Sequence, residues 1–109
     1  MNMEHRVMLL DALMQMRRDH QAGRIGMYIG KADAHVLAGF VAGYRSCLVD
    51  NGAGDAEATE FSKWLSFEKE EFPPEGWATK YLRDCNGDHV AAITKFLDFV
   101  AEFRARRER

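Results

Sequence analysis

Apolar side chains recur every three or four residues through most of this 109-residue chain, and no segment shows sustained alternation of apolar and polar residues. Such spacing lines one face of a helix, whereas a half-buried strand requires alternation. The pattern is strongest over residues 33–50 and 88–106 and weaker over 3–20, 55–65 and 77–85. We therefore predict an all-α fold: a single domain over residues 1–109, built as a bundle of about five helices.

The residues between these segments are typical of helix ends. Asp33, Asp55 and Asp88 precede three of the segments, and an aspartate there accepts hydrogen bonds from first-turn backbone N–H groups. Glycine-rich or proline-rich connections separate the segments at residues 51–54, 72–76 and 86–87. We expect the three aspartates to be N-caps and the connections to be turns or loops.

The segment Arg-Ile-Gly-Met-Tyr-Ile-Gly at residues 24–30 leads into the apolar helix expected over residues 33–50. We expect a tight connection here and regard residues 24–44 as the packing hub of the domain. Gly39 and Gly43 lie one turn apart in that helix, and each weakens a helix relative to alanine. Close approach of another helix would compensate, so we predict a helix crossing at these glycines.

Composition limits the environment and the partners. The formal net charge of −2 provides no basic field for nucleic acid, and the arginines near the C-terminus lie where a helix end favours cations. No stretch approaches the ~20 apolar residues that span a bilayer, so we expect no membrane partner. Cys47 and Cys85 fall at apolar helical positions, and we expect both to be buried, reduced thiols in a cytoplasmic protein.

Catalytic and metal-binding motifs were sought among the histidines, cysteines and carboxylates. The chain contains no Cys-x-x-Cys or His-x-x-x-His pair. Cys85 and His89 are four residues apart, but Asn86-Gly87 separates them, so they need not share a helical face and neither cysteine has a positioned base. Residues 24–30 are similar to a nucleotide-pocket segment of gyrase-type ATPases, but Ile25 replaces its proline and no sheet is expected to support that fold. We predict that the protein is not an enzyme and binds no cofactor or metal.

Charge is distributed unevenly along the chain. Residues 50–75 hold eight acidic and two basic side chains, a local net charge of −6, whereas residues 104–109 carry a net charge of +3. Two interpretations are open. The acids form a solvated face with ordinary helix-end charges, or they form an acidic surface for a basic partner.

The chain resembles small bacterial proteins that are encoded beside polymorphic and contact-dependent growth inhibition toxins. The resemblance is carried by Gly26-Met27-Tyr28-Ile29-Gly30, by Leu37, Phe40, Gly43 and Tyr44, by Phe61, Trp64 and Trp77, and by Asn86-Gly87-Asp88 followed by Ala91, Phe96 and Phe103. It implies an immunity protein, which binds a cognate toxin domain in the cytoplasm of the producing cell and occludes its active site. It supplies no functional residues.

Many such toxins are nucleases, whose phosphate-binding sites are basic, and an acidic surface would complement them. We therefore predict that the toxin-binding surface consists of four glutamates with one or both nearby tryptophans as aromatic anchors: Glu68, Glu70, Glu71, Glu75, Trp64 and Trp77. The alternative function is a homodimeric helical interaction or scaffold module that uses the Gly39 and Gly43 face or the methionine-rich first helix. A nucleic-acid-binding regulator or an unrecognised enzyme is the third class.

Overall fold

A computed structural model describes residues 7–107, and the chain forms helices without any β-strand over that span. The elements are α1 (Leu9–Gln21), α2 (Gly26–Ile29), α3 (Ala34–Asp50), α4 (Ala56–Lys63), the π-helical turn η1 (Trp64–Glu68), α5 (Trp77–Asp84) and α6 (His89–Arg107). The prediction of an all-α domain with about five substantial helices is confirmed. Met3, predicted to begin the first helix, lies outside the described residues. No helix over residues 7–107 has the length and apolar character to cross a bilayer.

The three predicted N-caps are confirmed. Oδ1 of Asp33 accepts hydrogen bonds from the backbone N–H groups of His35 and Val36 at 2.9 and 3.1 Å. Oδ1 of Asp55 accepts one from Ala58, and Oδ1 of Asp88 accepts one from Ala91. These bonds satisfy donors that a helix leaves without a partner in its first turn, and they fix where α3, α4 and α6 begin.

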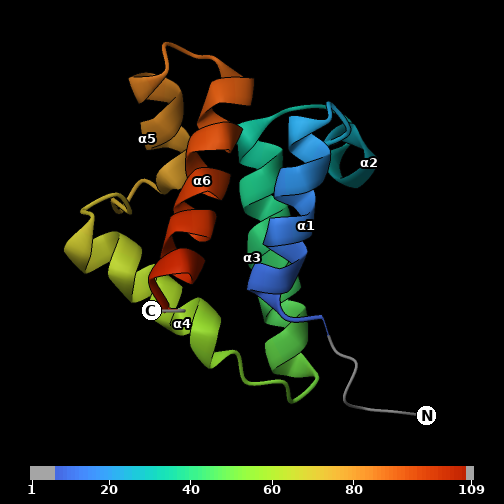
Figure 1. The fold of residues 1–109 in the computed structure, drawn as a ribbon, viewed down its shortest axis with the longest axis vertical. Coiled ribbons are helices and arrows are strands. Elements are labelled where there is room, and N and C mark those ends of the chain that lie inside the picture. Colours follow the sequence, from blue (N-terminus) through green and yellow to red (C-terminus); the bar gives the residue numbers. More distant parts are fainter. Residues whose placement is uncertain (1–6, 108–109) are drawn as a thin grey trace.

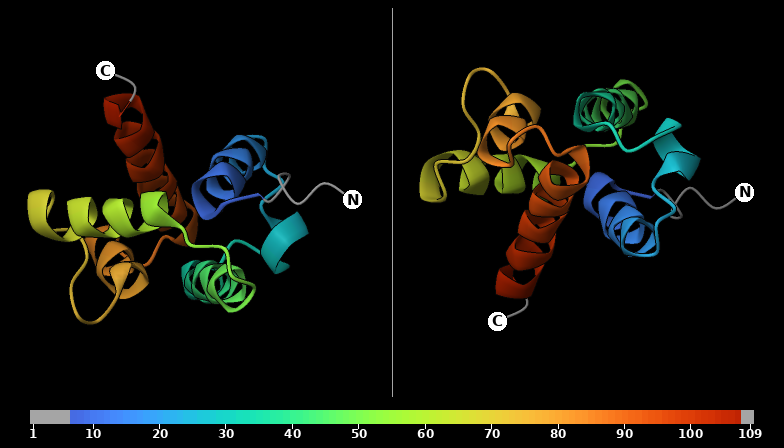
Figure 2. Two further views of the ribbon diagram at one scale, coloured as in Figure 1. Left: turned by 90° about the horizontal axis from the view of Figure 1, so that it is seen from below. Right: turned by 90° about the horizontal axis from the view of Figure 1, so that it is seen from above.

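The last helix, α6, lies at the centre of the molecule and contacts α1, α3 and α5 (Figure 1). The helix α4 and its continuation η1 run across the C-terminal half of α6 (Figure 2), where Phe61 packs edge-on against Phe103. The largest fully buried side chains come from α1, α3, η1, α5 and α6: Leu10, Leu13, Met16, Leu37, Leu65, Tyr81, Ile93, Phe96, Leu97 and Val100. They form one core, as expected for a single domain of this size.

The tight connection predicted before α3 is confirmed. Residues 26–29 form the single turn α2, which Gly30 ends with a φ of 85° that favours glycine. The Tyr28 hydroxyl donates a hydrogen bond to Oδ2 of Asp19, and Arg24 forms an ion pair with Oδ1 of the same carboxylate at 3.0 Å. Asp19 is buried, so these contacts fasten the α1–α2 turn onto the end of α1.

The predicted helix crossing at Gly39 and Gly43 is wrong. Both glycines are exposed, and a Cβ added to either would meet no atom within 4 Å in the part of the chain that the structure describes. Only Ala34 and Leu37 of the 17 residues of α3 are fully buried. The helix packs through one narrow side, and the face that carries the glycines is directed away from the core.

The predicted burial of both cysteines is also wrong. Cys47 is exposed on the uncovered side of α3, and Cys85 at the end of α5 is half-buried. Both are free thiols. Helical spacing and apolar neighbours did not reveal that residues 7–107 cover α3 on one side only.

Candidate protein-binding surface

The third predicted helix ends in a wide turn that changes which side chains face the core. The N–H of Lys69 donates to the carbonyl of Trp64, five residues earlier, at 3.1 Å, and the N–H of Glu71 reaches the carbonyl of Leu65 at 2.8 Å. Such π-helical turns insert an extra residue into the helical repeat and are frequent at functional sites. Here the turn keeps Trp64 and Leu65 inside while Phe67 is 80% exposed.

The two tryptophans proposed as accessible anchors belong to the core instead. Trp64 is 5% exposed and lies 5.4 Å from Phe103 between ring centroids. Trp77 is 4% exposed and stacks on Phe96. Almost all of each indole is covered by the core, so the prediction that Trp64 or Trp77 is an exposed aromatic anchor is wrong.

The exposed aromatic residue near the acidic segment is Phe67, which sequence reasoning missed. It lies between Ser66 and Glu68, outside the apolar stripe formed by Ala58, Phe61, Trp64 and Leu65. That position was the available signal, because an aromatic residue off the buried stripe of a helix faces solvent. Phe72, 43% exposed, follows five residues later in the loop.

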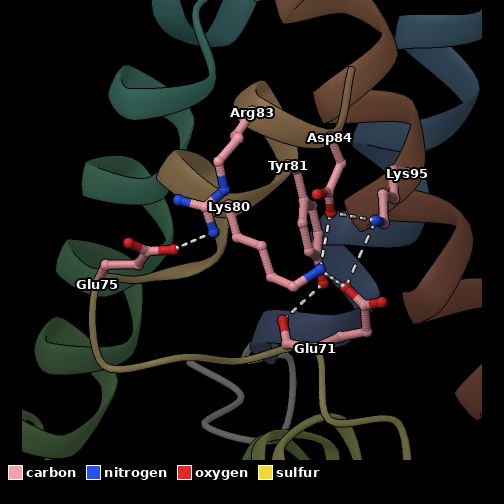
Figure 3. Close-up of polar contacts among 7 residues, drawn as sticks. All are labelled: Glu71, Glu75, Lys80, Tyr81, Arg83, Asp84 and Lys95. Carbon is pink, nitrogen blue, oxygen red and sulfur yellow. Dashed lines mark hydrogen bonds and ion pairs between the residues drawn. The ribbon is translucent and has the colours of Figure 1, made fainter. Parts of the chain in front are cut away.

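Glu71 is occupied by contacts within the molecule. Its carboxylate lies 3.1 Å from Nζ of Lys80 and 3.5 Å from Nζ of Lys95, and both ammonium groups also contact Asp84, at 2.7 and 2.9 Å (Figure 3). Two cations and two anions therefore form one neutral network between the loop, α5 and α6. The Tyr81 hydroxyl adds a hydrogen bond to the backbone carbonyl of Glu71 at 3.0 Å.

The contacts in this network shift the pKa values of its ionisable groups. Hydrogen bonds from Lys80 and Lys95 lower the pKa of Asp84 to about 2, below its ordinary value of 3.8. The hydrogen bond to Asp84 raises the pKa of Lys80. Burial raises the pKa of Tyr81, so its hydroxyl stays protonated and keeps donating to the loop. These groups hold the loop at residues 69–76 against α5 and α6.

The other three predicted glutamates differ in their surroundings. Glu75 pairs with Arg83 at 2.6 Å, and the hydrogen bond from Arg83 lowers the pKa of Glu75. Glu68 pairs with Arg106 at 3.1 Å. Glu70 is exposed, has a φ of 55° and forms no ion pair or side-chain hydrogen bond with any of residues 7–107. Of the four, it alone in this span has no internal counter-charge.

The acidic segment and the basic end of the chain lie beside each other, which neither sequence interpretation anticipated. Arg104 contacts Glu57 through two hydrogen bonds, of 2.7 and 3.1 Å, and also lies 2.9 Å from Asp11. Arg107 pairs with Glu60 at 3.0 Å. Much of the local excess of negative charge is therefore compensated by α6, and the acidic surface that remains is smaller than the sequence predicted.

An apolar groove of about 580 Å³ lies between α3 on one side and α4 and the start of α5 on the other. The wall from α3 includes Ala38, Val41 and Val49, and the opposite wall includes Phe72 and Trp77. His35, Arg45, Asp50 and Glu75 line it as well. The groove offers shape and apolar contact to a binding partner.

Neither a metal site nor a known relative identifies a different kind of functional site. Within the described span, no group of three or more histidine, cysteine, aspartate or glutamate side chains is placed to hold a metal ion. No protein-family model, curated protein or solved structure matches the chain. The resemblance to immunity proteins therefore stays a prediction from the sequence.

Proposed function

We propose that this chain is an immunity protein that binds a cognate bacterial toxin domain and occludes its active site. The observation that carries the proposal is the exposure of Phe67, 80%, on the π-helical turn between Ser66 and Glu68. An aromatic side chain beside charged groups is typical of the residues that contribute most to tight protein interfaces. The resemblance described above supplies the class of partner.

The exposed carboxylate of Glu70 favours a basic partner. Glu70 follows Phe67 by three residues and has no counter-charge among residues 7–107. Its left-handed backbone conformation is uncommon for a residue other than glycine and is typical of functional sites. A nuclease toxin has a cationic site for phosphate, which an exposed carboxylate complements. We therefore assign the toxin-binding surface to Phe67, Phe72 and Glu70, with Glu68 at its edge, in place of the buried tryptophans.

Co-expression with the product of the gene adjacent to the one that encodes this chain tests the proposal. We expect that product to arrest growth and this chain to restore it. Phe67→Asp should abolish protection, because it places a second charge where an apolar contact is needed. Val90→Asp is the matched control, since Val90 is also an exposed apolar residue but lies in the first turn of α6. Full protection by Phe67→Asp would contradict the assigned surface.

A separate experiment tests the predicted attraction between Glu70 and a basic toxin domain. Glu70→Lys should weaken binding of the purified toxin domain about tenfold and reduce the dependence of affinity on salt, because one attractive charge pair is lost. Glu71→Gln is expected to act through stability, since Glu71 holds the loop to Lys80 and Lys95. Affinity for toxin that is unchanged by Glu70→Lys at low salt would remove the acidic contact from the proposal.

A further inference from the structure

The face of α3 directed away from the core has an unusual composition for a surface helix. Its exposed residues between positions 36 and 49 are Val36, Gly39, Ala42, Gly43, Ser46, Cys47 and Val49, none of which carries a charge. Charged and polar side chains normally occupy the solvent side of such a helix. The groove along Ala38, Val41 and Val49 adjoins this face and extends its apolar area, with Arg45 and Asp50 also lining the groove.

The two glycines lie at the middle of that face. Residues three and four apart share one side of a helix, so Val36, Gly39, Gly43, Ser46 and Asp50 form one stripe. Glycine in a helix interior is unfavourable relative to alanine, and no contact within residues 7–107 compensates for either glycine. A stripe without side-chain bulk lets the backbone of a second helix approach closely.

The charges at the two ends of the face select the partner. Lys31 precedes α3 and Asp50 ends it, and both are exposed and form no ion pair within the described part of the chain. Lys31 lies ten residues before Val41, the midpoint of the two glycines, and Asp50 lies nine residues after it. Opposite charges at the two ends of one face, at nearly equal sequence distances from its centre, match a second copy of the same helix that runs in the reverse direction. A parallel copy would place like charges together.

We propose that the chain self-associates through an antiparallel pair of α3 helices related by a twofold axis. Gly39 of each copy then lies against Gly43 of the other, and Lys31 of each copy lies opposite Asp50 of the other. At 1.5 Å per residue α3 is about 25 Å long, so this contact is near the small end of stable interfaces and the dimer is weak. The surface differs from the one assigned to toxin binding, and the proposal does not depend on that function.

Sedimentation equilibrium of the purified chain from about 1 µM to about 1 mM tests for the dimer in a range that covers weak association. The wild-type chain is expected to shift from monomer to dimer across this range. Gly43→Leu should raise the dimer dissociation constant at least about tenfold, because its side chain blocks the approach of the second helix. The space around Gly43 is open within one chain, so the circular dichroism melt of the variant monomer checks that it stays folded.

The end charges test the antiparallel arrangement. Lys31→Glu and Asp50→Lys should each raise the dissociation constant about tenfold, since each replaces two attractive contacts with two repulsive ones. The double variant re-forms both pairs with reversed sign and should return to the wild-type value. Lys63→Glu is the matched control, because Lys63 is exposed on α4 and forms no ion pair among residues 7–107. A wild-type chain that stays monomeric at about 1 mM, or a double variant as weak as the single ones, would overturn the proposal.

Discussion

The indole of Trp77 stacks on the ring of Phe96, with centroids 4.0 Å apart and planes 9° from parallel. The contact joins the first residue of α5 to the middle of α6. Tyr81, one turn after Trp77, is fully buried and bonds to the loop through Glu71. The loop of residues 69–76, which follows the exposed Phe67, is thus held between a buried aromatic stack and a network of ion pairs. The candidate binding surface therefore lies beside a rigid support.

Trp77→Ala should lower the free energy of unfolding by about 3–5 kcal/mol, because it removes a buried aromatic side chain from the core. Phe67→Ala should change that free energy by no more than about 0.5 kcal/mol, since Phe67 is 80% exposed. Urea denaturation of the two variants beside the wild-type chain gives both values. Comparable losses for the two would contradict the placement of one aromatic inside and the other outside.

Asp55 links two helix starts, because one carboxylate oxygen caps α4 and the other accepts the N–H of Leu9 at 3.2 Å. The first turn of α1 has no cap of its own from Met8. Asp55→Ala should therefore cost about 2–3 kcal/mol of stability, the sum of a lost cap and a buried donor without a partner. Asp88→Ala removes an exposed cap only and should cost about 1 kcal/mol. Equal costs in thermal or urea unfolding would show that the Leu9 contact contributes nothing.

The sequence predicted the features of this fold that depend on neighbouring residues. Asp33, Asp55 and Asp88 could be assigned as caps because a cap acts on N–H groups two or three residues away. The role of Asp55 toward Leu9 could not, because it spans 46 residues and depends on where α1 meets α4. The same limit explains Arg104 and Glu57, which are 47 residues apart and cancel charges that were assigned to a partner.

The candidate site was harder to predict because helical spacing identifies a stripe but not what covers it. Trp64 and Trp77 were predicted as exposed anchors, but both rings pack against α6. The glycines of α3 were read as a packing surface, but no helix within the described residues lies over them. The π-helical turn over residues 64–68 was not predicted either, and the sequence indicated the exposure of Phe67 only through its position off the apolar stripe. Which side of each helix is covered depends on how the helices pack together, and the spacing of apolar residues does not specify this.

The open space around Gly43 among residues 7–107 reverses the effect that a side chain would have at the predicted helix crossing. Gly43→Ala should raise the free energy of unfolding by about 0.5–1 kcal/mol, because alanine favours the helix and its Cβ meets no atom within 4 Å among residues 7–107. Gly30→Ala should lower stability instead, since a φ of 85° strains a residue with a side chain. Thermal unfolding at about 1 µM, where a weak dimer is dissociated, measures both effects. A destabilised Gly43→Ala monomer would restore the original prediction.

Asp84 makes the stability of the fold depend on pH in the acid range. Its pKa is about 2 in the folded chain because Lys80 and Lys95 bond to it, against an ordinary value of 3.8. Between those two values the unfolded chain binds a proton that the folded chain does not, so stability falls as pH falls. The contribution is complete above about pH 4 and is lost as pH approaches about 2. Asp84→Asn should therefore lose less stability than the wild-type chain between about pH 5 and pH 2.5, as measured by urea unfolding at each pH.

A double lysine variant tests whether the contacts with Lys80 and Lys95 cause the low pKa of Asp84. Lys80→Met with Lys95→Met removes both donors, so it should raise the pKa of Asp84 towards 3.8 and flatten the dependence of stability on pH much as Asp84→Asn does. Carbon-13 NMR of the Asp84 carboxyl reports its titration directly. A wild-type midpoint near 3.8 would mean that the ion-pair network is loose in solution, and the loop that follows Phe67 would then lack the support described here.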